Sequence, residues 1–258
     1  MAVPTRKDFV NVDEREVLET LTGLGFAEAD ARTLADHFLD AERRGKTGHG
    51  LSRVEWLATR PFKLDPSARP RCVLDKPGYQ RWDADGALGY LTLAAIVEAQ
   101  LAEPPQHARL VVAQRCFPTG MLGYWGRRLA DGGLVAALTA TSPARLGHPD
   151  GGPKLAGTNP LAIAIPGTDG APLVSDVSMG RVTYGEVLAG EAAEDELVPF
   201  GREHAHKAFA LAVGLQLLVD SLVAEPGHGA VLLVARPEAD PLPALRTRAV
   251  DVRLPGQD

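Results

Sequence analysis

Short apolar runs that alternate with segments of helical spacing constrain the fold of this chain more than any other feature. Each run is a few residues long and is bounded by glycine, proline or polar residues, as expected of buried strands. The runs occupy residues 110–113, 134–139, 161–165 and 230–235. Between them, residues 89–102 and the segment around Trp125 repeat apolar side chains at helical spacing. Strands that alternate with helices favour a layered architecture, so we predict an α/β fold with a mixed layered sheet.

The chain is predicted to divide into four parts. Residues 1–58 hold two helices and a histidine-containing loop, and pack with the C-terminal part. Residues 59–105 form a connecting segment and a helix. The stretch 57–80, which is interrupted by proline, arginine and lysine, is expected to be irregular. Residues 106–200 form a central α/β ligand-binding domain, and residues 201–258 form a C-terminal helix and strand that return to the first part.

Composition limits the class of partner. The 258 residues include 27 Lys and Arg against 33 Asp and Glu, and nucleic-acid binding relies on a basic surface. The N-terminal residues lack the apolar core of a signal peptide, and no stretch approaches the roughly 18 uninterrupted apolar residues of a membrane span. The two cysteines have no metal-type spacing and fit a reducing compartment. We therefore expect a cytoplasmic protein that binds neither nucleic acid nor membrane and holds no structural metal.

Residues 147–166 are predicted to form a glycine-rich binding loop that runs into a strand. Gly151, Gly152 and Gly157 can take positive φ and bring the backbone close to a ligand. The threonine and asparagine that follow place short polar side chains where the strand begins. Glycine content alone fits an ordinary connection between two strands equally well.

A second polar segment, residues 47–53, places a histidine between two glycines. Little crowds the backbone there, so a ligand can approach the imidazole of His49 closely. Arg53 lies four residues further on and shares a face with His49 if the next helix begins at once. The alternative is a solvated histidine without a role.

Residues 206–223 form the longest predicted helix, which is apolar nearly all round and is therefore expected to be buried. Lys207 lies in its first turn, where the helix dipole disfavours a cation unless an anion is close. Asp176 ends a predicted strand and can cap the next segment or bind a ligand hydroxyl. The chain holds no GxGxxG, P-loop, GxSxG or HExxH motif, so a bound dinucleotide would need another kind of site.

Several of these segments resemble, in the same order, the segments of one family. They are Arg44-Gly45-Lys46-Thr47-Gly48-His49-Gly50 with Arg53, Asp150-Gly151-Gly152, Gly157-Thr158-Asn159-Pro160-Leu161-Ala162, Asp176 with Tyr184-Gly185, and His206-Lys207. The chain is thereby similar to the malate/L-lactate dehydrogenase family of the non-Rossmann type. That family also contains ureidoglycolate dehydrogenases, diketogulonate reductases and reductases of cyclic ketimines. The similarity extends to Leu254-Pro255-Gly256.

The resemblance implies a homodimeric oxidoreductase that uses NADH or NADPH and acts on a small carboxylate-bearing substrate. Hydride would pass between the nicotinamide and the carbon that bears a 2-hydroxy, 2-oxo or 2-imino group. His49 would contact the substrate or nicotinamide, Arg53 would clamp the carboxylate through its bidentate fork, and Lys207 would assist. The residues expected on the cofactor side are Ser142, Gly157, Thr158, Asn159 and Asp176.

Three departures from the family pattern leave two functions open. Pro118 stands where the family has a histidine acid/base, Gly48 replaces a serine beside His49, and the segment between Asp176 and Lys207 is short. The first function is reduction of a small 2-oxo acid or cyclic 2-imino acid, for instance in a specialised biosynthetic pathway. The second is a repurposed protein that has lost hydride transfer and cofactor, either a lyase, isomerase or cyclase or a non-catalytic partner.

Cys116 lies in the same remodelled turn as Pro118. A thiol there would be a nucleophile if the neighbouring Arg115 lowered its pKa. The alternative, which the residue type favours, is a small buried filler.

Overall fold

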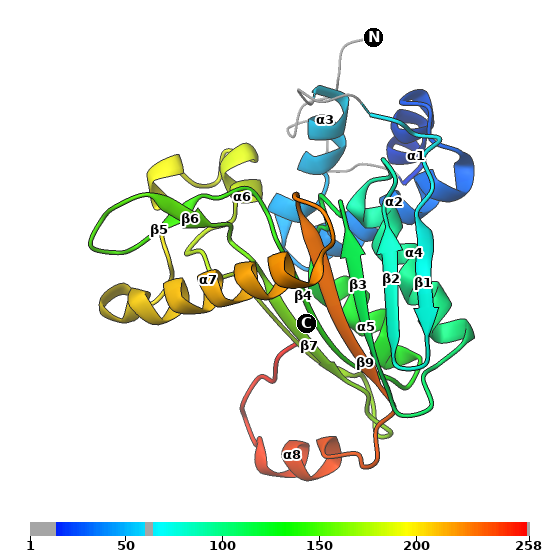
Figure 1. Cartoon of the computed structure of the whole chain (residues 1–258). Coiled ribbons are helices and arrows are strands. Elements are labelled where there is room, and N and C mark those ends of the chain that lie inside the picture. The colour runs from blue at the N-terminus through cyan, green and yellow to red at the C-terminus, as the bar shows by residue number, and fades with distance from the viewer. Residues whose placement is uncertain (1–13, 60–63, 257–258) are drawn as a thin grey trace.

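The computed structural model describes residues 14–59 and 64–256. A seven-stranded mixed sheet runs through its centre in the order β1-β2-β3-β9-β4-β7-β8 (Figure 1). Among these strands only β2 and β3 pair in parallel. The strands are β1 (Arg71–Lys76), β2 (Tyr79–Asp83), β3 (Ala108–Gln114), β4 (Val135–Ala140), β7 (Leu161–Ile165), β8 (Leu173–Val177) and β9 (Gly229–Ala235), with a separate hairpin of β5 (Leu146–Gly147) and β6 (Lys154–Ala156). The predicted α/β class with a mixed sheet is confirmed.

Helices cover both faces of this sheet. The helices of the described residues are α1 (Glu14–Gly23), α2 (Glu28–Arg43), η2 (Thr47–His49), α3 (Ser52–Thr59), α4 (Gly89–Ala102), α5 (Leu122–Asp131), α6 (Tyr184–Leu188), η3 (Glu194–Glu196), η4 (Arg202–His204), α7 (Ala205–Leu222) and α8 (Leu242–Arg248), of which α4, α5 and α7 pack on the sheet. In β9, Leu232 joins the main core with residues of α4 and α5, whereas the adjacent Val231 packs with Val219 of α7. Because successive strand residues point to opposite faces, α7 lies across the sheet from α4 and α5 (Figure 1).

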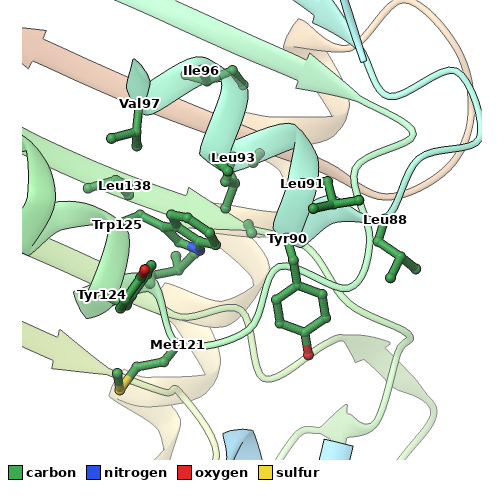
Figure 2. Packing of buried hydrophobic residues seen from close by; sticks show 14 of the residues in the cluster. Leu88, Tyr90, Leu91, Leu93, Ile96, Val97, Met121, Tyr124, Trp125 and Leu138 are labelled. Carbon is green, nitrogen blue, oxygen red and sulfur yellow. The ribbon is translucent and has the colours of Figure 1, made fainter. Parts of the chain in front are cut away.

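The main core forms where α4 and α5 pack on the sheet (Figure 2). Trp125 of α5 and Leu93 of α4 are fully buried, and Leu138 of β4 lies with them. Gly126 lets α5 approach the sheet closely, since an added Cβ would lie 3.1 Å from that of Ala164. Burial of each large apolar side chain contributes about 1.5–3 kcal/mol relative to exposure. This packing fixes both helices and therefore the loops at their N-terminal ends.

The expectation that residues 57–80 are irregular is wrong, because they contain β1 and the start of β2. β1 lies at the edge of the sheet and is almost wholly exposed. An exposed edge strand buries no face, so its sequence carries no apolar alternation, and charged residues are common there.

The helix expected at 206–223 is confirmed as α7, but the prediction that it is buried is wrong. Leu211, Leu217 and Leu218 expose 51%, 62% and 46% of their surface. Only a narrow stripe is buried, with Val219 against the central sheet and Ala212 against the β5–β6 hairpin. The segment Arg202–Leu222 has the length and apolar composition of a membrane-crossing helix, with a mean hydropathy of 1.2. Its apolar outer face is thus uncovered in the single chain.

Candidate active site

A cavity of about 620 Å³ lies where the N-terminal segment meets the central sheet. Its walls come from parts of residues 45–59, 117–122, 140–145 and 183–188. Single residues of α4 and β8, two residues of the Gly157–Pro160 loop, and Ser178 just after β8 complete them. The volume falls within the range of small-molecule sites. Among residues 14–59 and 64–256, no three His, Cys, Asp or Glu side chains gather into a group that could hold a metal ion.

His49 ends the short helix η2 and lines the cavity. Its side chain is half-buried and makes no hydrogen bond to a described residue, so its ring nitrogens are free for a ligand. Burial, and then the positive charge of Arg53, lower the pKa of His49, so the imidazole is neutral near pH 7. A neutral imidazole has one donor and one acceptor, which suits a polar contact to a substrate.

The close packing of α6 explains why position 48 is a glycine. An added Cβ would lie 2.6 Å from the backbone nitrogen of Glu186 in α6, so a serine would collide with that helix. The glycine that replaces the family serine therefore allows α6 to close over the loop that carries His49.

Arg53 is buried in α3 with 9% of its surface exposed. Its Nε donates to the carbonyl oxygen of Gly48 (2.7 Å), and its guanidinium lies 5.4 Å from the ring of Trp56. No carboxylate among the described residues pairs with it, and burial lowers the pKa of the guanidinium, although it remains charged. A buried cation without a counter-ion is costly unless an anion binds, and the role of Arg53 as a carboxylate clamp stays a prediction.

Tyr90 also lines the cavity and was not singled out by sequence. It lies in the first turn of α4, and its ring leaves the core with the hydroxyl pointing away from Trp125 and Leu138 (Figure 2). Burial raises the pKa of the phenol while Arg53 opposes that rise, so the hydroxyl keeps its proton near neutral pH. No described residue hydrogen bonds to it. In the sequence, Tyr90 is simply one residue of a helix, and only the tertiary structure directs it at Arg53.

A buried histidine supports this wall. His37 of α2 is fully enclosed, and its Nε2 accepts a hydrogen bond from the backbone nitrogen of Met121 (3.0 Å). Burial lowers the pKa of His37 to about 3, so the ring is neutral. Gly120 has a φ of +70° and passes so close that an added Cβ would lie 2.4 Å from both the His37 and Tyr90 rings. The turn that carries Pro118 is thus fixed by a histidine whose only sequence signal was its place on an amphipathic helix.

Three of the five residues expected on the cofactor side line the same cavity: Ser142, Thr158 and Asp176. Asp176 caps the start of α5, because its Oδ2 accepts from the backbone nitrogen of Gly123 (2.7 Å), and burial raises its pKa. The structure therefore brings His49 and Arg53 together with these three residues.

Asn159 and Gly157 do not line the cavity. The Asn159 side chain is fully buried, donates to Ala212 O (3.0 Å) and Gln216 Oε1 (2.9 Å) of α7, and accepts from the backbone nitrogen of Ser142 (3.2 Å). An added Cβ on Gly157 would lie 2.3 Å from Ser142 Oγ. Both residues contact Ser142 and thereby support a residue of the cavity lining without lining the cavity themselves.

Lys207 and the tip of the predicted glycine loop lie apart from the cavity lining. Lys207 is exposed at the start of α7. Gly151 and Gly152 are exposed where the chain turns between β5 and β6, a hairpin that the loop prediction did not include. Only Thr158 and Pro160, at the far end of that loop, reach the cavity.

Cys116 is fully buried and lies outside the cavity lining. Burial raises the pKa of its thiol to about 12, and Arg115 instead pairs with Asp83 (2.6 Å). The thiol therefore stays protonated, which supports the buried-filler interpretation.

Comparison with known proteins agrees with the fold. The model of the malate/L-lactate dehydrogenase family matches residues 13–202. The chain is 32% identical over 204 residues to a (2R)-3-sulfolactate dehydrogenase (NADP(+)) from Chromohalobacter salexigens, covering 74% of this chain and 59% of that protein. It is 30% identical over 182 residues to a Δ1-pyrroline-2-carboxylate/Δ1-piperideine-2-carboxylate reductase from Pseudomonas aeruginosa, covering 68% and 53%.

Among solved structures, the Δ1-piperideine-2-carboxylate reductase from Pseudomonas syringae superposes with a TM-score of 0.80 at 20% identity, over 99% of this chain and 91% of that one. This protein belongs to the malate/L-lactate dehydrogenase family, as the resemblance indicated. Its relatives are dehydrogenases and reductases that act on small carboxylate substrates. The chain spans about half to two thirds of the length of the curated relatives it matches, for example 48% and 64%.

Proposed function

We propose that the protein is an NADH- or NADPH-dependent reductase of a small 2-oxo acid or cyclic 2-imino acid. The observation that carries this proposal is the buried guanidinium of Arg53, which lines one cavity with the imidazole of His49. Among the residues that the structure describes, no carboxylate pairs with Arg53 and no group hydrogen bonds to the His49 ring. A carboxylate on Arg53 would satisfy the buried charge and hold the adjacent 2-carbon within the cavity. The relatives that act on 2-oxo or 2-imino acids support the same substrate class.

The cofactor would supply hydride, and the residues of this chain would bind, orient and protonate. Ser142, Thr158 and Asp176 form the polar wall that would hold the nicotinamide end. A 2-oxo group that accepts hydride also needs a proton on its oxygen, and Tyr90 is placed to donate one, with His49 as a hydrogen-bonding partner. Because Lys207 does not line the cavity, these roles are assigned without it.

A repurposed protein without hydride transfer is the second candidate. The observations that favour it are the proline at 118, which cannot move a proton, and the short segment between Asp176 and Lys207. In that case the cavity and Arg53 would still bind a small carboxylate, but neither NADH nor NADPH would bind.

Titration of purified protein with NADH and NADPH, followed by nucleotide fluorescence, separates the two candidates. We expect binding of at least one of them at micromolar levels. Absence of binding of both up to millimolar concentration would overturn the reductase. If binding is found, His49→Ala should keep the far-UV circular dichroism of the wild type and lose turnover. Unchanged turnover would remove His49 from the mechanism.

A homodimer, formed in the cytoplasm, is part of the same proposal. The uncovered leucines of α7 support it, since an exposed apolar face of this kind is typical of a subunit interface. Light scattering after size exclusion should give twice the chain mass of 27.4 kDa, and Leu217→Glu should shift the protein towards the monomer. A wild-type monomer at micromolar concentration would contradict this part.

A further inference from the structure

Arg145 gives the cavity a second arginine that no described carboxylate neutralises, beside Arg53 and the exposed Lys46. Its backbone nitrogen donates to Ala156 O (2.8 Å), which fixes its place beside the β5–β6 hairpin. Its guanidinium is half-buried and lies over the ring of Tyr184, with Cζ 3.3 Å from the ring centroid. Both residues line the same cavity as Arg53. Stacking holds the plane of the guanidinium and leaves the N–H donors at its edge for an anion.

Tyr184 and Gly185 connect the two arginines. Arg145 covers the ring of Tyr184, and the Tyr184 phenol is close enough to Arg53 to raise the pKa of that guanidinium. An added Cβ on Gly185 would lie 2.4 Å from Arg53 Nη2. The start of α6 therefore spans the distance from one cation to the other within a single cavity.

The acids that line this cavity are engaged with backbone groups. Glu186 accepts from the backbone nitrogen (2.6 Å) and hydroxyl (2.8 Å) of Thr183, which caps α6. Asp176 accepts from the backbone nitrogen of Gly123. Neither forms an ion pair with a described cation. No described acid therefore neutralises the two arginines of the cavity, and anionic groups of a ligand would do so.

We propose that Arg145, held over Tyr184, is a second anion site of the cavity, separate from the carboxylate site of Arg53. This inference rests on the proposed reductase function, and it specifies the kind of ligand that the reductase would bind. Two ligands could supply the second anion: a substrate with a further acid group beyond its 2-oxo carboxylate, and NADPH through its 2′-phosphate. The shared chemistry is an oxyanion that accepts hydrogen bonds from the guanidinium.

Calorimetric binding without turnover tests this site with two probe pairs. Malate differs from lactate, and NADPH from NADH, by an extra anionic group. The wild type should bind the more anionic member of at least one pair more tightly. Arg145→Met should lower the ratio of the two dissociation constants of that pair about tenfold. If Arg145→Met loses the preference for malate over lactate, the site binds substrate. If it loses the preference for NADPH over NADH, the site binds the cofactor phosphate.

Arg181→Met is the matched control. This variant loses the same charge as Arg145→Met. In the wild type, however, Arg181 pairs with Glu196 (3.3 Å) and does not line the cavity. If Arg145→Met binds all four probes as the wild type does, or if Arg181→Met loses as much preference, the second anion site is overturned. Failure of the wild type to bind either nucleotide overturns the reductase alone, because malate and lactate still measure the site.

Discussion

Arg53→Met is expected to lower kcat/KM for a 2-oxo or 2-imino acid about 30- to 1,000-fold and, at the same time, to make the fold more stable. Loss of a buried charged contact to the substrate costs about 2–4 kcal/mol of transition-state binding. In the free protein the same guanidinium is buried and no carboxylate of residues 14–59 or 64–256 pairs with it, so its removal relieves a desolvation cost.

Arg53→Met also removes the hydrogen bond to Gly48 O (2.7 Å). This loss offsets about 1 kcal/mol of the stability gained when the desolvation cost of Arg53 disappears. We therefore expect a net rise of about 1–2 kcal/mol in the free energy of unfolding. Steady-state kinetics and denaturant unfolding measure the two effects. Arg43→Met, which removes an exposed charge at the end of α2, should change neither. A variant of Arg53 that is less stable and equally active would show that the arginine serves the fold.

Tyr90→Phe is expected to slow reduction of a 2-oxo acid by about 100-fold or more and to affect a cyclic imine far less. Hydride transfer to a carbonyl leaves an alkoxide that must take a proton, whereas hydride transfer to a protonated imine yields the neutral amine directly. Removal of the phenolic proton therefore matters for the first substrate only.

Phenylalanine keeps the ring that packs against His37 and Phe38 at 5.0 and 5.2 Å, so the fold should be preserved. Single-turnover rates with both substrate types, together with thermal unfolding, are the measurements. Equal losses on both substrates would mean that Tyr90 only shapes the cavity. No loss on the 2-oxo acid would leave proton donation to His49 or to water.

The sequence predicted elements well where a periodic apolar pattern met a buried surface. Helix 89–102 was predicted with the bounds that α4 has, because its residues pack on the sheet along its whole length. The failures have the opposite cause. β1 buries almost nothing and so carries no pattern, and α7 is apolar on a side that the single chain does not cover. Pattern alone therefore distinguishes helix from strand more reliably than buried from exposed.

The candidate site divides in the same way. His49 and Arg53 were found by sequence because they lie close together in one unusual polar segment. They belong to two elements, η2 and α3, separated by the non-helical Gly50, so the expected shared helix face is not the reason that both line the cavity. The roles of Gly157 and Asn159 were misjudged, since their contacts to Ser142 and α7 depend on residues distant in sequence. Tyr90 and Arg145 went unnoticed because nothing local marks them.

By itself, the sequence determined the family, the alternation of strands and helices, and the pair His49 and Arg53 that lines the cavity, because each depends on short-range pattern or on a motif. Only the tertiary structure decided that Arg53 has no counter-ion within the described part of the chain, that Lys207 does not line the cavity, and that α6 packs against Gly48. These features arise from contacts between segments far apart in the chain, where burial and charge depend on what the fold brings alongside.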